Sequence, residues 1–98
     1  MTIEKSINNS QLTLTVVGRL DTSTAPQLEK VVADDLNGIN ELVIDCKELE
    51  YVSSAGLRVL LGAQKKFAAA GSLTIQHVCE EINEVFEMTG FSDILTIE

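Results

Sequence analysis

Two spacings of apolar residues divide this chain into strands and helices. Alternation of apolar and polar residues is typical of a strand, whereas apolar residues three and four positions apart are typical of a helix. Strands are predicted at residues 2–7, 11–18, 41–46, 72–76 and 94–97. Helices are predicted at about residues 25–36, 54–70 and 80–89. The predicted order of elements is therefore β-β-α-β-α-β-α-β.

This order of elements predicts an α/β fold. Asn8-Asn9-Ser10 is a turn cluster between the first two strands, so these strands are expected to form an antiparallel hairpin. The later strands are joined through helices, which favours parallel pairing and a mixed β-sheet with the helices packed on it. The continuous apolar centre of residues 41–46 is typical of a strand buried on both faces. Whether the helices cover one face or both stays open, and residues 47–50 are interpreted as a polar connection.

Residues at the ends of the predicted helices agree with these boundaries. Thr24 is a suitable N-cap for the first helix, and Pro26 stands in the first turn, where its missing N–H costs little. Asn37-Gly38 is a typical helix stop. Gly71 ends the second predicted helix and Gly90 ends the third. Each predicted helix is therefore closed by a glycine before the chain turns to the next strand.

The composition predicts a small globular domain. The chain has 98 residues, of which 45% are hydrophobic, so one domain spanning residues 1–98 can bury a core. No apolar run approaches the roughly 18 residues that a membrane-spanning helix needs. The N-terminus lacks the basic and apolar regions of a signal peptide. We therefore expect a cytoplasmic protein with no membrane span.

The net charge of -8 indicates which kinds of partner this chain can bind. Nucleic acids and anionic membrane surfaces attract Lys and Arg, so an acidic chain argues against both. A basic protein partner is compatible with this charge. A group of glutamates in the last predicted helix is interpreted as a solvated face, with an acidic rim that faces a partner as the alternative. These residues are Glu80, Glu81, Glu84 and Glu87.

The sequence contains no pattern typical of a metal, cofactor or catalytic site. Cys46 and Cys79 form no CxxC motif and are interpreted as buried or half-buried free thiols. No glycine-rich loop of the phosphate-binding or dinucleotide-binding kind occurs. His77 follows a predicted strand and has no obvious partner. A serine hydrolase would need His77 within hydrogen-bonding reach of Ser54, so a hydrolase is a third alternative and we expect no catalytic residues.

The stretch from Val52 to Leu60 carries the most specific chemistry. Ser53 and Ser54 lie where a strand-like run passes into a helix. A serine at this place can cap the helix, and the same helix end also suits the negative charge of a phosphate. Gly56 in the first turn costs the helix up to about 1 kcal/mol relative to alanine, so its presence predicts close approach by another chain.

Residues 52–60 read Val-Ser-Ser-Ala-Gly-Leu-Arg-Val-Leu, and they follow the segment Leu42–Cys46 and the turn Gly18-Arg19-Leu20-Asp21. With the C-terminal Gly-Phe-x-x-Ile segment, they resemble the STAS domains of bacterial anti-sigma factor antagonists, and the resemblance covers essentially the whole chain. It implies a single STAS-like domain and a non-enzymatic regulatory module. It further implies that the chain binds an anti-sigma factor with serine kinase activity and thereby releases a sigma factor. Phosphorylation of one serine would break this complex, and a serine phosphatase would restore it.

The resemblance also implies roles for individual residues. Many family members have Asp-Ser-(Ser/Thr)-Gly-Leu where this chain has Ser53, Ser54 and Ala55 before Gly56. Ser54 is therefore the expected phosphorylation site, and Ser53, which looks more like the helix cap or a neighbour of the site, is the second choice. Asp21 is expected to support the site. The residues expected to bind the partner are Asp21, Ser23, Thr24, Ser53, Ser54, Gly56 and Arg58. The alternative function is that of a STAS accessory subunit of a transporter or of a stress-signalling scaffold.

Overall fold

The computed structural model describes residues 1–34 and 38–98, and it confirms the predicted α/β fold. The strands are β1 (Thr2–Asn8), β2 (Gln11–Leu20), β3 (Glu41–Asp45), β4 (Leu49–Val52), β5 (Ser72–Gln76) and β6 (Thr96–Ile97). The helices are α1 (Ala25–Asp34), α2 (Ser54–Ala70) and α3 (Glu80–Thr89), and a short 3-10 helix, η1 (Phe91–Asp93), follows α3. The bounds of α2 and α3 equal the prediction, whereas β2 continues to Leu20 and β6 begins only at Thr96.

The strands form a mixed sheet in the order β1-β2-β3-β5-β6. β1 and β2 form the predicted antiparallel hairpin, with Ile7 opposite Leu12. β3 pairs in parallel with β2 and with β5, and β6 pairs in parallel with β5. Each of these parallel pairs is joined by a crossover that contains a helix, which allows the two strands to run in the same direction.

The interpretation of residues 47–50 as a polar connection is wrong, because β4 begins at Leu49. β4 lies off the main order of the sheet and pairs in parallel with the last residues of β2, so that Leu20 lies opposite Val52. The strand has four residues, and its two central residues are exposed. A strand this short shows no alternation of apolar and polar residues, which explains why the hydrophobic pattern did not reveal it.

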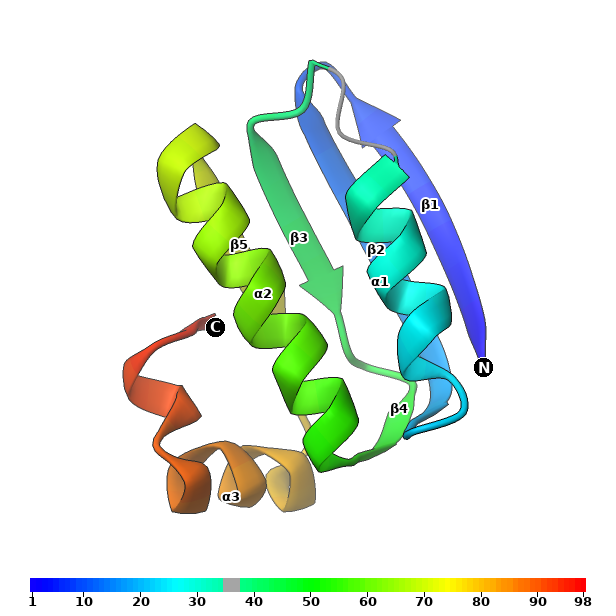
Figure 1. Cartoon of the computed structure of the whole chain (residues 1–98), viewed down its shortest axis with the longest axis vertical. Coiled ribbons are helices and arrows are strands. Elements are labelled where there is room, and N and C mark those ends of the chain that lie inside the picture. Colours follow the sequence, from blue (N-terminus) through cyan, green and yellow to red (C-terminus); the bar gives the residue numbers. More distant parts are fainter. Residues whose placement is uncertain (35–37) are drawn as a thin grey trace.

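Helices α1 and α2 cover the same face of the sheet. Figure 1 shows them side by side in front of the strands, with α3 at one end of the sheet. Between these helices and the sheet lies the hydrophobic core. Its fully buried members include Leu12, Leu14, Ile44 and Ile75 of the strands and Leu28, Leu60 and Phe67 of the helices. The question that the sequence left open is therefore answered for α1 and α2, which share one face.

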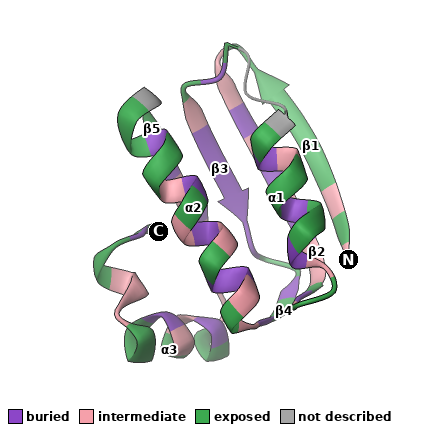
Figure 2. Cartoon of the chain, in the orientation of Figure 1, coloured by how far each residue is buried: buried purple, intermediate pink, exposed green. Residues whose placement is uncertain are grey.

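β3 is buried on both of its faces, as its apolar run predicts. Leu42 and Ile44 belong to the core under the helices. Val43 points to the opposite face, where it lies between Thr13 and Thr74 of the neighbouring strands and is only 5% exposed. Figure 2 shows the contrast between this buried central strand and the exposed edge strand β1. Neighbouring side chains on the sheet therefore bury the second face of β3 without needing α1 or α2.

The ends of the helices agree with the sequence in part. Gly71 and Gly90 follow α2 and α3 as predicted, and Gly90 has a φ of 81°, which favours glycine. Thr24 precedes α1, but its hydroxyl accepts from the Asp21 N–H and donates to the Arg19 carbonyl instead of capping the helix. The predicted end of this helix at residue 36, and the Asn37 part of its stop, lie outside the described residues.

Candidate functional site

The pairing of β4 with β2 brings the two motifs singled out in the sequence together. Leu20 and Val52 are partners in the sheet, and the Ser53 N–H donates to the Leu20 carbonyl at 2.8 Å. The chain then leaves the sheet at Asp21 on one side and at Ser54 on the other. The two turns therefore start next to each other, although they are more than thirty residues apart in the sequence.

Ser53 and Ser54 have different surroundings. Ser53 is the N-cap of α2, and its Oγ accepts from the Gly56 N–H at 3.3 Å. Ser53 is half-buried, whereas Ser54 is exposed at the first position of the helix. Within the described ranges, the Ser54 hydroxyl makes no hydrogen bond. The predicted capping role of Ser53 is thus confirmed, and the Ser54 hydroxyl is accessible from solvent.

Gly56 is required by a neighbour within the same chain. A Cβ atom at this position would lie 2.6 Å from Leu20 Cγ and 3.0 Å from the Leu20 carbonyl oxygen. Gly56 is buried. The inference that another chain approaches closely at Gly56 is therefore wrong. The residue lets α2 begin close to the end of β2, and it offers no surface to a partner.

Asp21 organises the turn beside the two serines. Its Oδ1 accepts from the Ser23 N–H, the Ser23 hydroxyl and the Thr24 N–H at 3.0, 2.8 and 3.2 Å. The hydrogen bond from the Ser23 hydroxyl is the main reason why the pKa of Asp21 lies below its usual value. Three residues predicted to bind a partner therefore form one hydrogen-bonded turn, with Ser23 exposed and Asp21 and Thr24 half-buried.

A cation–π pair next to this turn was not predicted from the sequence. The Arg19 guanidinium carbon lies 4.2 Å from the centre of the Tyr51 ring, and the two residues are partners in the pairing of β2 with β4. The Arg19 Nε also lies 3.9 Å from Asp21 Oδ2. Arg19 and Tyr51 are both exposed. Since β4 itself was not predicted, no signal in the sequence placed Tyr51 beside Arg19.

Arg58 lies on the exposed side of α2, one turn beyond Ser54, and lines a groove between α1 and α2. Two adjoining hollows of about 160 and 170 Å³ share Glu29, Arg58 and Val59 in their walls.

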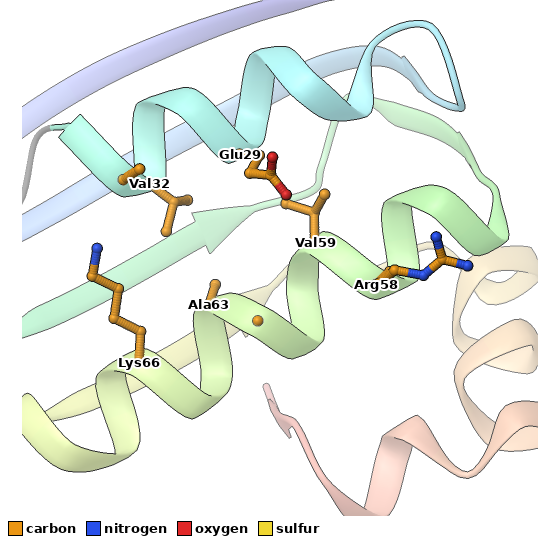
Figure 3. Close-up of a pocket in the computed structure, with 8 residues that line it drawn as sticks. Glu29, Val32, Arg58, Val59, Ala63 and Lys66 are labelled. Atoms are coloured by element: carbon orange, nitrogen blue, oxygen red, sulfur yellow. The ribbon is translucent and has the colours of Figure 1, made fainter.

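The first hollow, of about 160 Å³, reaches Thr22 and Ala55, close to the start of α2. We call the second the interhelical groove (Figure 3), and its lining includes Glu29, Val32, Arg58, Val59, Gly62 and Lys66.

His77 pairs with a carboxylate and not with either serine. Its Nδ1 lies 3.0 Å from Asp45 Oδ1, a partner that was not obvious from the sequence. Burial alone would raise the pKa of Asp45, but the hydrogen bond with His77 and the Lys47 N–H outweigh it and lower this pKa. Among residues 1–34 and 38–98, no hydrogen bond joins His77 to Ser54.

The cysteines are free thiols, as predicted, with Cys46 buried and Cys79 half-buried. Burial raises the pKa of the Cys46 thiol to about 12, which keeps it protonated near neutral pH. No cluster of three or more potential metal ligands occurs in the part of the chain that the structure describes. In the same residues, every helix is too short or too polar to cross a membrane.

Comparison with known proteins identifies the family to which this fold belongs. The family model of the STAS domain matches residues 2–98. This chain belongs to the STAS domain family. The STAS chain is 33% identical over 92 residues to the anti-sigma-B factor antagonist of Bacillus subtilis, and the alignment covers 92% of this chain and 84% of that protein. The family resemblance inferred from residues 52–60 is therefore confirmed.

Solved structures agree with this assignment of the fold. An anti-sigma factor antagonist from Mycobacterium paratuberculosis has a TM-score of 0.88 at 22% identity, with 98% of this chain and 83% of that chain covered. SpoIIAA, a Bacillus cell fate determinant solved in its phosphorylated form, has a TM-score of 0.76 at 15% identity, with 99% and 91% covered. At these identities the likeness shows that the STAS chain shares their fold.

Proposed function

We propose that the STAS chain is an anti-sigma factor antagonist. It binds an anti-sigma factor that has serine kinase activity, releases a sigma factor, and is switched off by phosphorylation of Ser54. A serine phosphatase restores binding. The observation that carries this proposal is the exposed Ser54 hydroxyl at the first position of α2, beside the Asp21 turn. A curated relative with the name anti-sigma-B factor antagonist supports the same function.

The surroundings of Ser54 suit a phosphorylation switch. A phosphate adds about -1.5 to -2 charges and three acceptor oxygens. At a helix N-terminus the free N–H groups and the helix dipole stabilise such a charge. The Ser53 side chain occupies only the Gly56 N–H of this first turn, and the Ser53 carbonyl accepts from the Leu57 N–H. The free domain can therefore carry the phosphate, while a partner seated on this face meets a new charge and a bulky group.

The proposed function needs no catalytic residue in this chain. The kinase activity belongs to the partner, and Ser54 is its substrate. The absence of a hydrogen bond between His77 and Ser54 among residues 1–34 and 38–98 supports this assignment, because a hydrolase would need that imidazole to accept the proton of Ser54. The proposal places the protein in the cytoplasm, where sigma factors and their regulators act.

Mapping of the modified residue tests the proposal. The full chain is incubated with the purified anti-sigma factor kinase of the same organism and ATP, and the product is digested and analysed by mass spectrometry. We expect one phosphate, on Ser54. Phosphate on Ser53 alone would move the switch to the second choice, and its absence from both serines would overturn the proposed mechanism.

A further inference from the structure

The interhelical groove has apolar walls that no part of the described chain fills. Val32, which comes from α1, belongs to the core and only 6% of it is exposed, whereas Val59 and Gly62 of α2 are half-buried and exposed, respectively. Figure 3 shows the two valines on facing sides of the groove. Gly62 is exposed, and a Cβ atom added there would meet nothing within 4 Å. The groove volume of about 170 Å³ is therefore open space next to apolar side chains.

The charges of the groove have a definite arrangement. Arg58 and Lys66 both come from α2, at the two ends of the stretch that lines the groove, and Glu29 comes from α1. Arg58 and Lys66 are eight positions apart, which corresponds to about 12 Å along the helix axis. Neither cation forms a salt bridge within residues 1–34 and 38–98. In a chain of net charge -8, these two exposed cations make the α2 side of the groove locally basic.

The groove is continuous with the face that carries Ser54. The hollow between Thr22 and Ala55 shares Glu29, Arg58 and Val59 with it, so the surface runs from the start of α2 to Lys66 without interruption. Ser54 and Arg58 are four residues apart and therefore lie on the same side of the helix. A partner that covers Ser54 would therefore also contact the adjoining groove.

We propose that the interhelical groove receives an amphipathic helix of the anti-sigma factor, with aliphatic side chains against Val32, Val59 and Gly62. Acidic residues two turns apart on that helix pair with Arg58 and Lys66. A groove with apolar walls and charges two turns apart matches such a helix. This assignment rests on the proposed function and extends the partner-binding face along α2. It also gives the phosphate on Ser54 a second effect, because the phosphate can attract Arg58 away from the groove.

Filling the groove tests this proposal without disturbing the core. The substitution Gly62→Leu places a side chain in open space and replaces glycine in a helix, so the melting temperature should not fall. Affinity for the purified anti-sigma factor of the same organism, measured by calorimetry, should fall at least about tenfold. Lower affinity together with unchanged or higher stability would not arise from a merely structural role.

Neighbouring lysines provide the matched control. Lys65 and Lys66 are both exposed on α2, but only Lys66 lines the groove. We expect Lys66→Glu to weaken binding at least about fivefold and Lys65→Glu to change it less than about twofold, because only the first reverses a groove charge. Equal losses of affinity in the two variants would overturn the proposal that the partner binds in the groove.

Variants of Ser54 separate the groove from the proposed function. If Ser54→Glu weakens binding while Gly62→Leu and Lys66→Glu bind like the wild type, the groove proposal is wrong and the proposed function stands. If the wild-type chain does not bind the anti-sigma factor, both proposals fail. If Gly62→Leu and Lys66→Glu weaken binding and Lys65→Glu does not, the groove is part of the binding site for the anti-sigma factor.

Discussion

At the scale of single residues, the two adjacent serines differ in what surrounds them. Ser53 is half-buried and holds the Gly56 N–H, whereas Ser54 is exposed and its hydroxyl is unbonded within the described residues. Capping depends on residues within one turn, so the sequence alone could assign it to Ser53. The exposure of Ser54 depends on how α2 leaves the sheet, and the structure had to supply it.

Charge at Ser54 should control partner binding. We expect Ser54→Glu to weaken the affinity for the anti-sigma factor at least about tenfold, or about 1.4 kcal/mol, because it places a permanent negative charge on the binding face. Ser54→Ala should bind like the wild type, since it removes only an unbonded hydroxyl. Calorimetric titration of the wild type and both variants measures the difference in affinity. Equal affinities would show that charge at Ser54 does not control binding.

Loss of the cap at Ser53 should act on stability. Ser53→Ala should lower the free energy of unfolding by about 1 kcal/mol, because the Gly56 N–H loses its acceptor. Ser54→Ala is the control and should change the stability by less than about 0.5 kcal/mol, as expected for an exposed side chain. Urea titration followed by circular dichroism gives both values. A larger loss in the Ser54 variant would contradict this division of roles.

At the scale of elements, the junction of β2, β4 and α2 builds the site. The Leu20 carbonyl accepts from the Ser53 N–H, and the Leu20 side chain packs where a Cβ of Gly56 would lie. The Asp21 turn continues from the same strand. A change in the packing of β2 against the first turn of α2 would therefore move the Asp21 turn relative to Ser54.

Two glycines of α2 should respond in opposite ways to alanine. Gly56→Ala should lower the free energy of unfolding by about 1–3 kcal/mol, because the new methyl group overlaps Leu20. Gly62→Ala should raise it by up to about 1 kcal/mol, because alanine is the better helix former and meets no neighbour. Thermal and urea unfolding of both variants check this. Equal stabilisation by the two substitutions would show that Gly56 has room for a side chain.

The contact between Asp45 and His77 should make part of the stability depend on pH. It joins the carboxyl ends of β3 and β5, and the folded protein holds the pKa of Asp45 below the usual 3.8. A lowered carboxyl pKa stabilises the fold above the pKa of the unfolded chain, and this contribution is lost as the pH falls through the folded value. Asp45→Asn should therefore flatten the loss of stability between about pH 5 and pH 2.

Urea unfolding of the wild type and of Asp45→Asn across this acidic range measures the effect. Asp21 also has a lowered pKa, so the Asn variant should keep part of the wild-type slope. Parallel curves for the two proteins would show that the contact with His77 contributes nothing to acid sensitivity.

At the scale of the whole molecule, the proposed switch should act on the surface and leave the fold intact. Ser54 is exposed and outside the core, so its phosphorylation should leave the far-ultraviolet circular dichroism spectrum unchanged and the melting temperature equal or higher. The same phosphorylated chain should fail to bind the anti-sigma factor. Unfolding on phosphorylation would show that the modification acts on stability and not on the interface.

Most of the fold could be predicted from the sequence because it follows from local patterns. The helices over residues 54–70 and 80–89 have clear apolar spacing and closing glycines, and the buried strand at residues 41–46 is a continuous apolar run. β4 was missed because four residues with an exposed centre carry no periodicity. The end of β2 was missed because its alternation of buried and less buried residues stops at Val17, and the pairing shifts register between Gly18 and Arg19. The pairing of Arg19 with Tyr51 was missed with it.

The sequence by itself determined the order of the elements apart from β4 and η1, the STAS family and the serine motif with its cap at Ser53. These features depend on neighbours along the chain. Only the tertiary structure decided that Gly56 packs on Leu20, that His77 pairs with Asp45, and that a groove with two cations runs beside Ser54. Each of these depends on pairing or packing between segments distant in sequence, and the register of such contacts is set when the sheet and helices close around one core.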